Sequence, residues 1–214
     1  MALKNSPFDQ QAHWNDLYTR FSGQEHNSGR SSAFAQHFGT LLKEYSPGRL
    51  LELGCGAGED CQLFAAAGMH SVGLDFSRSA LNAARHRLAG QAQFVQQHLP
   101  QGLPFADQSF SAVFAHLSLH YFDDATTAFI FSEIHRVIRL NGRFALRVKS
   151  VENEFYGQGK QLGRDMYFCH GHVRRFFSST FLDALVAENT WRRLNPSQEQ
   201  HRPGYLTAVL QKTA

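Results

Sequence analysis

The stretch LLELGCGAGED, Leu50 to Asp60, combines a short strand, a glycine-rich turn and the start of a helix. Residues 49–53 form an apolar run of the kind found in buried strands, and the run ends directly at the glycines. Glycine suits the turn because other residues resist the backbone angles that the turn requires. Glycine also lets the backbone approach a ligand closely. With free amides at the start of the next helix, the stretch predicts a nucleotide-type site at the carboxyl end of a parallel strand.

The spacing of the glycines distinguishes between nucleotide ligands. The dinucleotide fingerprint G-x-G-x-x-G requires its third glycine at position 59, where this chain has Glu59. The pattern here is E-x-G-x-G-x-G, with Glu52 two residues before the first glycine. A carboxylate at this strand end can reach a ligand ammonium group and is unlike the neighbour of a diphosphate. The spacing therefore argues against a nicotinamide oxidoreductase, which we keep as an alternative.

A second acidic residue follows the next predicted strand. Asp75, in the segment VGLDFS, comes 21 residues after Gly54. A carboxylate at this strand end can accept hydrogen bonds from both hydroxyls of a ribose. The alternative is that Asp75 caps the following helix. Combined with the glycine loop, its position favours the ribose role.

Strands and helices alternate on both sides of this loop. Apolar runs predict strands at residues 49–53, 71–74, 92–97, 110–116 and 143–148. Caps and helical periodicity predict helices at residues 59–67 and 77–89, and from Asp123 or Asp124 to about 139. Alternation of this kind predicts a parallel sheet covered by helices on both faces.

The ends of the chain are predicted with less regular elements. Helices are expected at residues 8–20 and about 32–45, and residues 1–48 as a whole are expected to form an N-terminal helical cap or lid. Residues 151–173 show no clear period. A helix from Ser178 or Ser179 to about 188 is followed by strands at 190–194 and 206–211, which are expected to form a hairpin at the sheet edge.

Composition bounds the class of protein. The chain has 214 residues, of which 43% are hydrophobic, 18% are charged and 19 are phenylalanine. A disordered chain would be poorer in aromatic residues and richer in charge. No apolar run approaches the roughly 18 residues that span a bilayer, and the first residues show no apolar core of a secretory signal. We therefore expect a cytoplasmic protein that is not inserted in a membrane.

The net charge of +3 is unevenly distributed. Residues 1–129 carry 8 basic and 11 acidic side chains, a net charge of −3, whereas residues 130–214 carry 13 and 7, a net charge of +6. A basic C-terminal part could favour an anionic substrate or a nucleic acid, or it could be an ordinary solvated surface.

The cysteines and histidines give no metal signature. Cys55, Cys61 and Cys169 form no C-x-x-C motif and cannot make a paired disulfide framework. His170 and His172 could share one face of a strand, but no third ligand stands nearby. We therefore expect no metal site.

Three blocks in this order resemble the class I S-adenosylmethionine-dependent methyltransferases. The first is ELGCGAG, Glu52 to Gly58, which is similar to the cofactor loop of that family. The second is GLDFS, Gly73 to Ser77, which is similar to its ribose-binding strand end. The third comprises LPFADQSFSAVFAHLSLHYF and EIHRVIRLNGRFALRV, residues 103–122 and 133–148, which are similar to its fourth strand, next helix and fifth strand.

The resemblance implies a fold and a domain plan. The fold is an α/β, Rossmann-like three-layer sandwich with a mostly parallel seven-stranded sheet, an antiparallel edge strand and the N-terminal helical cap. The cofactor-binding methyltransferase domain would cover residues 49–214, with an acceptor-side flap at about 150–177.

The resemblance also implies a cofactor site for S-adenosylmethionine, with S-adenosylhomocysteine as product. By position, Glu52, Gly54, Gly56 and Gly58 would line the methionine part, with Cys55 in the same loop as a small packing residue. Asp75 would hold the ribose. Residues expected around the adenine and the sulfonium are Phe76, His98, Leu99, His116 and Leu117.

Two positions depart from the pattern of the family. His98 stands where many members have an acidic residue that bonds the adenine amino group. Ser111 stands where many have Asp, at a position expected to serve structure.

Methyl transfer is an in-line displacement that depends mainly on orientation, and a general base is needed only for a protonated, weakly acidic acceptor. His120 is the candidate base because histidine titrates near neutrality. Alternatively, His120 and Tyr121 only shape the pocket wall or cap a helix. Residues expected on the acceptor side are Trp14, Tyr18, Tyr121, Tyr156 and Arg174.

The expected function is methyl transfer from S-adenosylmethionine to a small-molecule acceptor. The same fold could instead modify RNA or protein, although no appended RNA-binding module or long basic stretch is present. A non-catalytic regulatory protein that binds S-adenosylmethionine is the third alternative.

Overall fold

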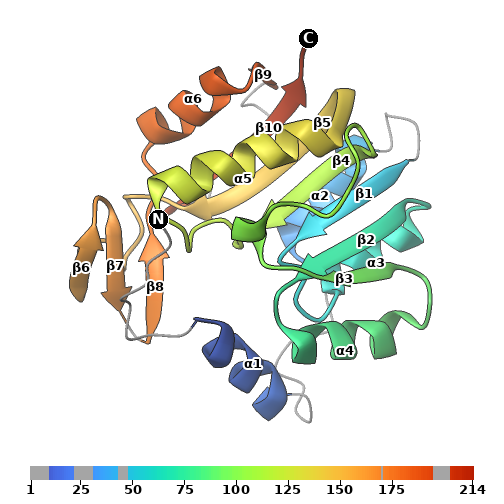
Figure 1. The fold of residues 1–214 in the computed structure, drawn as a ribbon, viewed down its shortest axis with the longest axis horizontal. Coiled ribbons are helices and arrows are strands. Elements are labelled where there is room, and N and C mark those ends of the chain that lie inside the picture. Colours follow the sequence, from blue (N-terminus) through green and yellow to red (C-terminus); the bar gives the residue numbers. More distant parts are fainter. Residues whose placement is uncertain (1–9, 22–30, 43–47, 170, 195–202) are drawn as a thin grey trace.

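A seven-stranded sheet forms the centre of the computed structural model (Figure 1), which describes residues 10–21, 31–42, 48–169, 171–194 and 203–214. The strand order is β3-β2-β1-β4-β5-β10-β9. The strands are β1 (Arg49–Leu53), β2 (His70–Asp75), β3 (Gln93–Gln96), β4 (Phe110–His116), β5 (Ile138–Lys149), β9 (Trp191–Arg193) and β10 (Tyr205–Lys212).

The strands nearest the glycine loop are parallel. β1 lies between β2 and β4, with Glu52 opposite Gly73 on one side and Phe114 on the other. β10 runs antiparallel to both β5 and β9. The antiparallel strand was expected at the edge of the sheet. The strand β10 instead lies second from the edge, because β9 pairs with it on the outer side. The predicted terminal hairpin of these two strands is confirmed.

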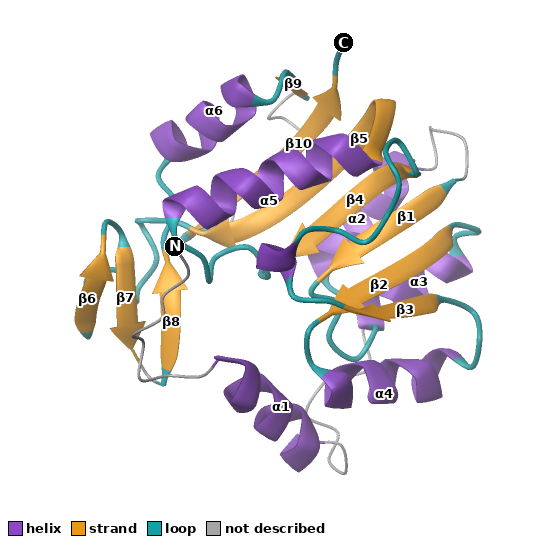
Figure 2. Ribbon diagram, in the orientation of Figure 1, coloured by secondary structure: helices purple, strands orange, loops and turns teal. Residues whose placement is uncertain are grey.

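Helices cover both faces of the sheet, as predicted (Figure 2). α5 (Asp124–Val137) and α6 (Ser179–Glu188) cover one face, and α2 (Ala33–Leu42) and α3 (Glu59–Ala66) cover the other. α4 (Arg78–Leu88) packs beside β3, a short 3-10 helix follows at Leu99–Gln101, and α1 (Gln10–Phe21) packs on α4.

Side-chain caps begin four of these helices, and at the start of α2 the hydroxyl of Ser32 accepts from the backbone N–H of Ala35 at 2.9 Å. Ser77 accepts a hydrogen bond from the backbone of Ala80, which confirms the predicted cap of α4. Asp123 and Ser178 cap α5 and α6 in the same way. These residues satisfy amides that the first turn of a helix leaves without backbone partners.

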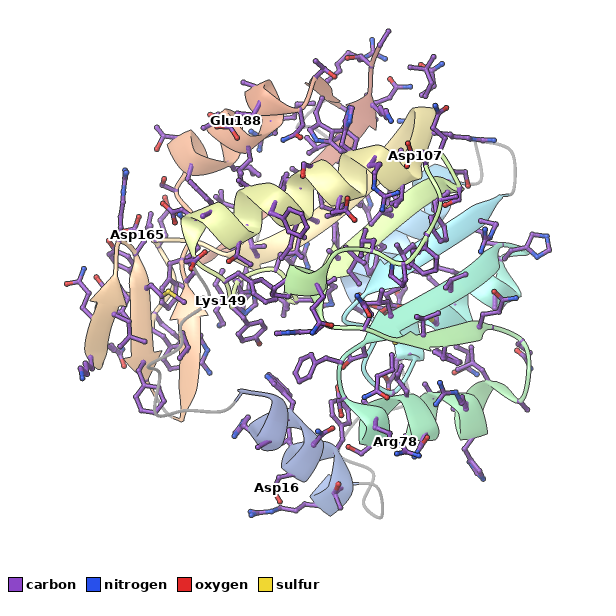
Figure 3. All side chains as sticks on the ribbon, in the orientation of Figure 1. Asp16, Arg78, Asp107, Lys149, Asp165 and Glu188 are labelled. Atoms are coloured by element: carbon purple, nitrogen blue, oxygen red, sulfur yellow. The ribbon has the colours of Figure 1, made fainter. Side chains whose placement is uncertain are left out.

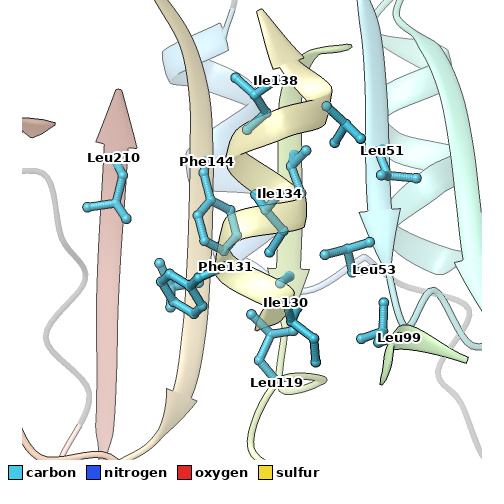
Figure 4. Close-up of a cluster of buried hydrophobic side chains, with 14 of the residues drawn as sticks. Leu51, Leu53, Leu99, Leu119, Ile130, Phe131, Ile134, Ile138, Phe144 and Leu210 are labelled. Carbon is cyan, nitrogen blue, oxygen red and sulfur yellow. The ribbon is translucent and has the colours of Figure 1, made fainter. Parts of the chain in front are cut away.

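Strand alternation divides the core into two main clusters. Leu51 and Leu53 face α5, where they join the larger cluster (Figure 4). Leu50 faces the opposite side, where the fully buried ring of Phe114 lies 5.1 Å from the rings of both Phe34 and Phe64. Since Phe34 belongs to α2, part of the predicted N-terminal cap shares the core of the sheet domain. The boundary between residues 48 and 49 stays a prediction.

A second, three-stranded sheet lies within the predicted flap. Its antiparallel strands are β6 (Lys160–Gly163), β7 (Met166–Cys169) and β8 (His172–Arg175). The sequence showed no period here because these strands have only four residues each, and β6 is largely exposed. In Figure 2 this sheet stands beside the carboxyl ends of the central strands.

An ion pair fixes the flap to the central domain. The guanidinium of Arg175, 1% exposed, donates from Nε and Nη2 to Oδ1 of Asp124, at 2.9 and 2.7 Å. The backbone N–H of Arg175 also donates to the carbonyl of His120, at 3.0 Å. The position of the flap next to the loop after β4 is therefore set by direct bonds.

The predicted end of α5 was wrong by about two residues. The helix ends at Val137 and β5 begins at the next residue, whereas Asn141 and Gly142 were expected to end the helix. Asn141 has φ of 63° and lies inside β5, where the register against β4 shifts. The turn signal therefore marks a strand irregularity, not a helix end.

The phenylalanine cluster predicts a large difference between two identical substitutions. Phe114→Ala removes a fully buried ring and should lower the free energy of unfolding by about 3–5 kcal/mol. Phe129→Ala, on a side chain that is 44% exposed, should change it by less than about 0.5 kcal/mol. Urea unfolding measures both. Equal losses in the two variants would contradict the placement of Phe114 in the core.

Candidate active site

A cavity of about 190 Å³ lies at the carboxyl ends of β1, β2 and β4, with α1 on its other side. Figure 3 shows side chains filling the space between α1 and the central strands. The residues that line the cavity are Trp14, Tyr18, Gly54, Leu74, Asp75, Phe76, Gln97, His98, Leu99, His116, Leu117, Ser118, Tyr121 and Phe122.

Ten of these residues were expected from the sequence, and four were missed. The missed residues are Leu74, Gln97, Ser118 and Phe122. Leu74 and Gln97 lie at or just after the ends of β2 and β3, and this strand-end position was the available signal. Ser118 and Phe122 belong to the irregular loop after β4, where no residue pattern indicates which side chains point inward.

Asp75 joins the cavity to the glycine loop. Its Oδ2 accepts a hydrogen bond from the backbone N–H of Gly56 at 3.0 Å, and its Oδ1 accepts one from Ser77 at 2.8 Å. Burial raises the pKa of Asp75, and the backbone hydrogen bonds from Ser77, Gly56 and Phe76 oppose that shift. Because each carboxylate oxygen can accept more than one bond, Asp75 can hold the loop and still accept from a ligand hydroxyl.

Four of the five amides of residues 54–58 are already bonded within the protein. Gly54 and Cys55 donate to the carbonyl of Leu74, at 2.7 and 3.1 Å, and Gly58 donates to that of Cys55 at 2.9 Å. Gly56 donates to Asp75. A diphosphate would need these N–H groups, and it would face a carboxylate there. The geometry therefore supports the argument from spacing against a dinucleotide.

Two glycines leave room that a side chain would fill. Gly54 has φ of 69°, and a Cβ there would lie 2.5 Å from the Cβ of Ser118. Gly56 has φ of 53°, and a Cβ there would collide with the hydroxyl of Tyr18. Gly54 and Ser118 both line the cavity. The loops that follow β1 and β4 can therefore approach each other this closely only because residue 54 has no side chain.

Other residues of the loop pack behind it. The thiol of Cys55 faces Gly73, and burial raises the pKa of this thiol to about 11. Gly58 begins α3 and lies against Ala84 and Leu88 of α4. Neither Cys55 nor Gly58 lines the cavity. The side chain of Cys55 is buried, in agreement with its expected role as a small packing residue.

Glu52 also lies behind the loop and not on the cavity wall. It is 4% exposed, its Oε2 has no hydrogen-bond partner within the described ranges, and burial raises its pKa well above the usual value. Asp60 lies on the same side, where its carboxylate accepts from the backbone and hydroxyl of Ser32 and lies 3.7 Å from Nδ1 of His116. Acidic groups therefore surround the glycine loop.

The wall after β4 contains a strained backbone position. Leu117 has φ of 57°, which is uncommon for a bulky residue, and its N–H donates to the carbonyl of Arg147 at 2.9 Å. The next residue, Ser118, has a buried Oγ without a partner among the residues described. Strain and an orphaned hydroxyl at a cavity wall are typical of ligand sites.

α1 covers the cavity. The ring of Trp14 on α1 lies edge to face with that of Tyr121, at 5.9 Å, and 6.4 Å from that of Tyr18. Asn15 anchors the helix because its Oδ1 accepts from the hydroxyl of Ser77 at 2.8 Å. Burial raises the pKa of Tyr18, and Asp75 adds to the shift.

Phe76, His98 and Leu99 form the far wall. The rings of Phe76 and His98 lie 5.8 Å apart in an edge-on arrangement. Burial lowers the pKa of His98, which favours the neutral imidazole. These residues offer an apolar slot with one polar edge, as a purine base requires.

The remaining expected residues lie outside the cavity lining. His120 is 1% exposed and lies behind Tyr121, with ring centroids 4.4 Å apart. Tyr156 is 37% exposed on the flap, where its hydroxyl donates to Asp165 at 2.9 Å. Arg174 lies on β8, and its Nη1 donates to the carbonyl of Cys169 at 3.0 Å.

Two kinds of feature are absent from the part of the chain that the structure describes. Those residues contain no group of three or more His, Cys, Asp or Glu placed to hold a metal ion, and His170 lies outside them. No helix within the same ranges is long and apolar enough to span a membrane.

Comparisons with known proteins agree with this geometry. Residues 51–146 match the family model described as a methyltransferase domain. An uncharacterized methyltransferase of Synechocystis sp. is 39% identical over 102 residues, 47% of each chain. A ubiquinone/menaquinone biosynthesis C-methyltransferase of Desulfotalea psychrophila is 36% identical over 98 residues, 45% of this chain and 39% of its own.

Solved structures extend the likeness over the whole fold. The 1,6-didemethyltoxoflavin-N1-methyltransferase of Burkholderia thailandensis, solved with 1,6-didemethyltoxoflavin and S-adenosylhomocysteine, superposes with a TM-score of 0.66. It is 18% identical, and the match covers 98% of this chain and 93% of that one. At this identity the likeness shows the fold alone.

Residues 51–146 thus match a methyltransferase domain, and the fold around them is similar to that of S-adenosylmethionine-dependent methyltransferases. The matched stretch spans about half the length of the curated relatives or less.

The close approach at Gly54 predicts the effect of adding one methyl group. Gly54→Ala should destabilise the protein by more than the roughly 1–2 kcal/mol of left-handed strain alone, because the new Cβ also meets Ser118. It should also abolish binding of S-adenosylhomocysteine, measured by calorimetry. Gly90→Ala is the control, because Gly90 also has a positive φ, 90°, but has open space around it. This variant should be destabilised by the backbone strain alone and should still bind S-adenosylhomocysteine. Normal binding by Gly54→Ala would contradict the close approach.

Proposed function

We propose that this protein transfers the methyl group of S-adenosylmethionine to a small-molecule acceptor. The observation that carries the proposal is Asp75, which lines the cavity and is held there by the amides of Gly56 and Ser77. A carboxylate fixed at this strand end suits a ribose, and the family model supports the same conclusion. The bound cofactor would supply a methyl group that its sulfonium already activates.

The residues present fit this cofactor. Asp75 accepts from ribose hydroxyls, and Phe76 and Leu99 enclose the adenine, with neutral His98 at its edge. Gly54 lets the methionine part approach the backbone. Glu52 lies behind the loop, where burial raises the pKa of its carboxyl group, so it would support the methionine part as a polar group and not as a fixed charge. The orphaned hydroxyl of Ser118 supplies a polar group on the same wall.

A small acceptor fits better than a macromolecule. Trp14 and Tyr121 meet edge to face above the cavity, so α1 restricts the access that an RNA or protein segment would need. Relatives named as C- and O-methyltransferases, and the toxoflavin enzyme, support small acceptors. A cytoplasmic location is part of the same proposal, and the buried thiols of Cys55, Cys61 and Cys169 fit a reducing compartment.

His120 remains the candidate base of this proposal. Its Nδ1 is buried without a partner among the described residues, and burial lowers its pKa well below 6.5. The imidazole is therefore neutral at pH 7 and able to accept a proton, but it is a weak base. It suits an acceptor that is already acidic, because a weak base suffices for such a proton.

The low pKa of His120 predicts the pH dependence of activity. Protonation of the imidazole should reduce kcat only below pH 6.5, so the rate should be flat from there to pH 8. His120→Ala should lower kcat by about 100-fold, the usual range for a general base, and remove the acid limb. Unchanged activity and an unchanged pH profile in this variant would exclude the base role.

The cofactor assignment is tested by calorimetric titration. S-adenosylhomocysteine should bind the wild type, and Asp75→Ala should weaken binding by about 100-fold or more, since two hydrogen bonds to a charged group are lost. Asp107→Ala is the control, because Asp107 pairs with Arg136 at the end of the molecule away from α1 (Figure 3). Binding of NADH with none of the sulfonium product would refute the proposal. Cofactor binding without turnover across thiols, amines, carboxylic acids and tRNA would favour the regulatory alternative.

A further inference from the structure

Two cationic side chains share an aromatic ring on the flap side of the site. The Nζ of Lys149, at the end of β5, lies 5.2 Å from the ring centroid of Phe155. The guanidinium carbon of Arg174, on β8, lies 5.5 Å from the same centroid. Lys149 also lies 5.2 Å from the ring of Tyr205. Figure 3 shows Lys149 between the flap and the central sheet, at the level of the strand ends.

No carboxylate neutralises these two cations within the described parts of the chain. Lys149 donates to the side-chain oxygen of Asn153 at 3.5 Å, and Arg174 donates to the carbonyl of Cys169 at 3.0 Å. The neighbouring Arg175 is different, because Asp124 pairs with it. Both Lys149 and Arg174 are partly buried, and an external anion could form charge-assisted hydrogen bonds with both.

The loop after β4 connects the two cations to the cavity, because the backbone N–H of Arg175, next to Arg174, donates to the carbonyl of His120 at 3.0 Å. Tyr121 lines the cavity, and its ring lies 4.4 Å from that of His120. After burial, Lys149 and Arg174 are the largest causes that lower the pKa of His120. Arg174 also lowers the pKa of Tyr121, although burial raises it to about 12 overall. The cations therefore lie near the part of the cavity wall that Tyr121 forms, with His120 beside it.

His120 supplies a second, independent sign of a ligand. Its Nδ1 is enclosed and has no hydrogen-bond partner among the described residues. Buried polar atoms are nearly always bonded, so an orphaned nitrogen beside two cations marks a place where a ligand polar group would fit.

We propose that the methyl acceptor is a carboxylate-bearing small molecule, whose anionic group binds Lys149 and Arg174 beside the ring of Phe155. The inference rests on the proposed methyl transfer and names the class of its acceptor. A planar or apolar body would lie along Phe155 and Tyr121, and the reacting atom would point past His120 into the cavity. Arg174 and Lys149 are thus specificity-determining residues, and they take no part in the bond-making step.

The test compares acids with their uncharged esters. Protein saturated with S-adenosylhomocysteine is titrated with benzoate and 4-hydroxybenzoate, and with the methyl ester of each. The acids should bind at least ten-fold more tightly than the esters. Lys149→Met and Arg174→Met, which keep the apolar stem, should remove this preference while S-adenosylhomocysteine still binds. Lys149→Arg and Arg174→Lys should retain it.

A matched control comes from the same flap. Arg164→Met removes an exposed cation that lies 3.9 Å from Asp165, and the preference for acids should persist. Equal binding of acids and esters, or no binding of either acid, would overturn the inference while leaving cofactor binding in place. Tight binding of a short single-stranded RNA that depends on Arg174 would also overturn it, in favour of a nucleic-acid acceptor. Loss of S-adenosylhomocysteine binding by the wild type would instead refute the proposed function itself.

Discussion

The carboxylate of Asp75 is the interaction on which the site depends. It bonds the amide of Gly56 in the glycine loop and the amide of Ser77 at the start of α4, so one side chain fixes two backbone segments. Ser77 in turn bonds Asn15, which anchors α1 over the cavity. A buried carboxylate is costly without such partners, and the backbone hydrogen bonds offset its burial. Loop, cavity wall and covering helix are therefore positioned by one connected set of bonds.

The uneven charge of the chain has a structural counterpart. Glu52, Asp60 and Asp75 gather around the glycine loop, in the half of the sequence with net charge −3. Lys149 and Arg174, from the part of the sequence with net charge +6, lie on the flap side, where both contact the ring of Phe155. A cationic cofactor and an anionic acceptor would each meet the opposite charge. On our proposal, two cations of the basic C-terminal part would bind the acceptor, and the other basic residues contribute to the surface.

Much of the fold was predictable because local signals agree with tertiary packing. The bounds of β1 and β4 were predicted correctly, since each is an apolar run ended by a turn or polar loop. The place of Asp75 on the cavity wall followed from its position at the carboxyl end of β2. The sheet β6-β7-β8 was missed because its strands are short and one of them is mostly exposed. Which side chains of the loop after β4 face inward depends on the φ of Leu117, which no sequence pattern indicates.

A crystal structure of the complex with S-adenosylhomocysteine tests the central claim most directly. We predict that both ribose hydroxyls lie within hydrogen-bond distance of the Asp75 carboxylate, with the adenine between Phe76 and Leu99. The Gly56 amide should keep its bond to Asp75 in the complex. An adenosyl group bound outside the cavity, or an Asp75 carboxylate turned away from the ribose, would contradict the account.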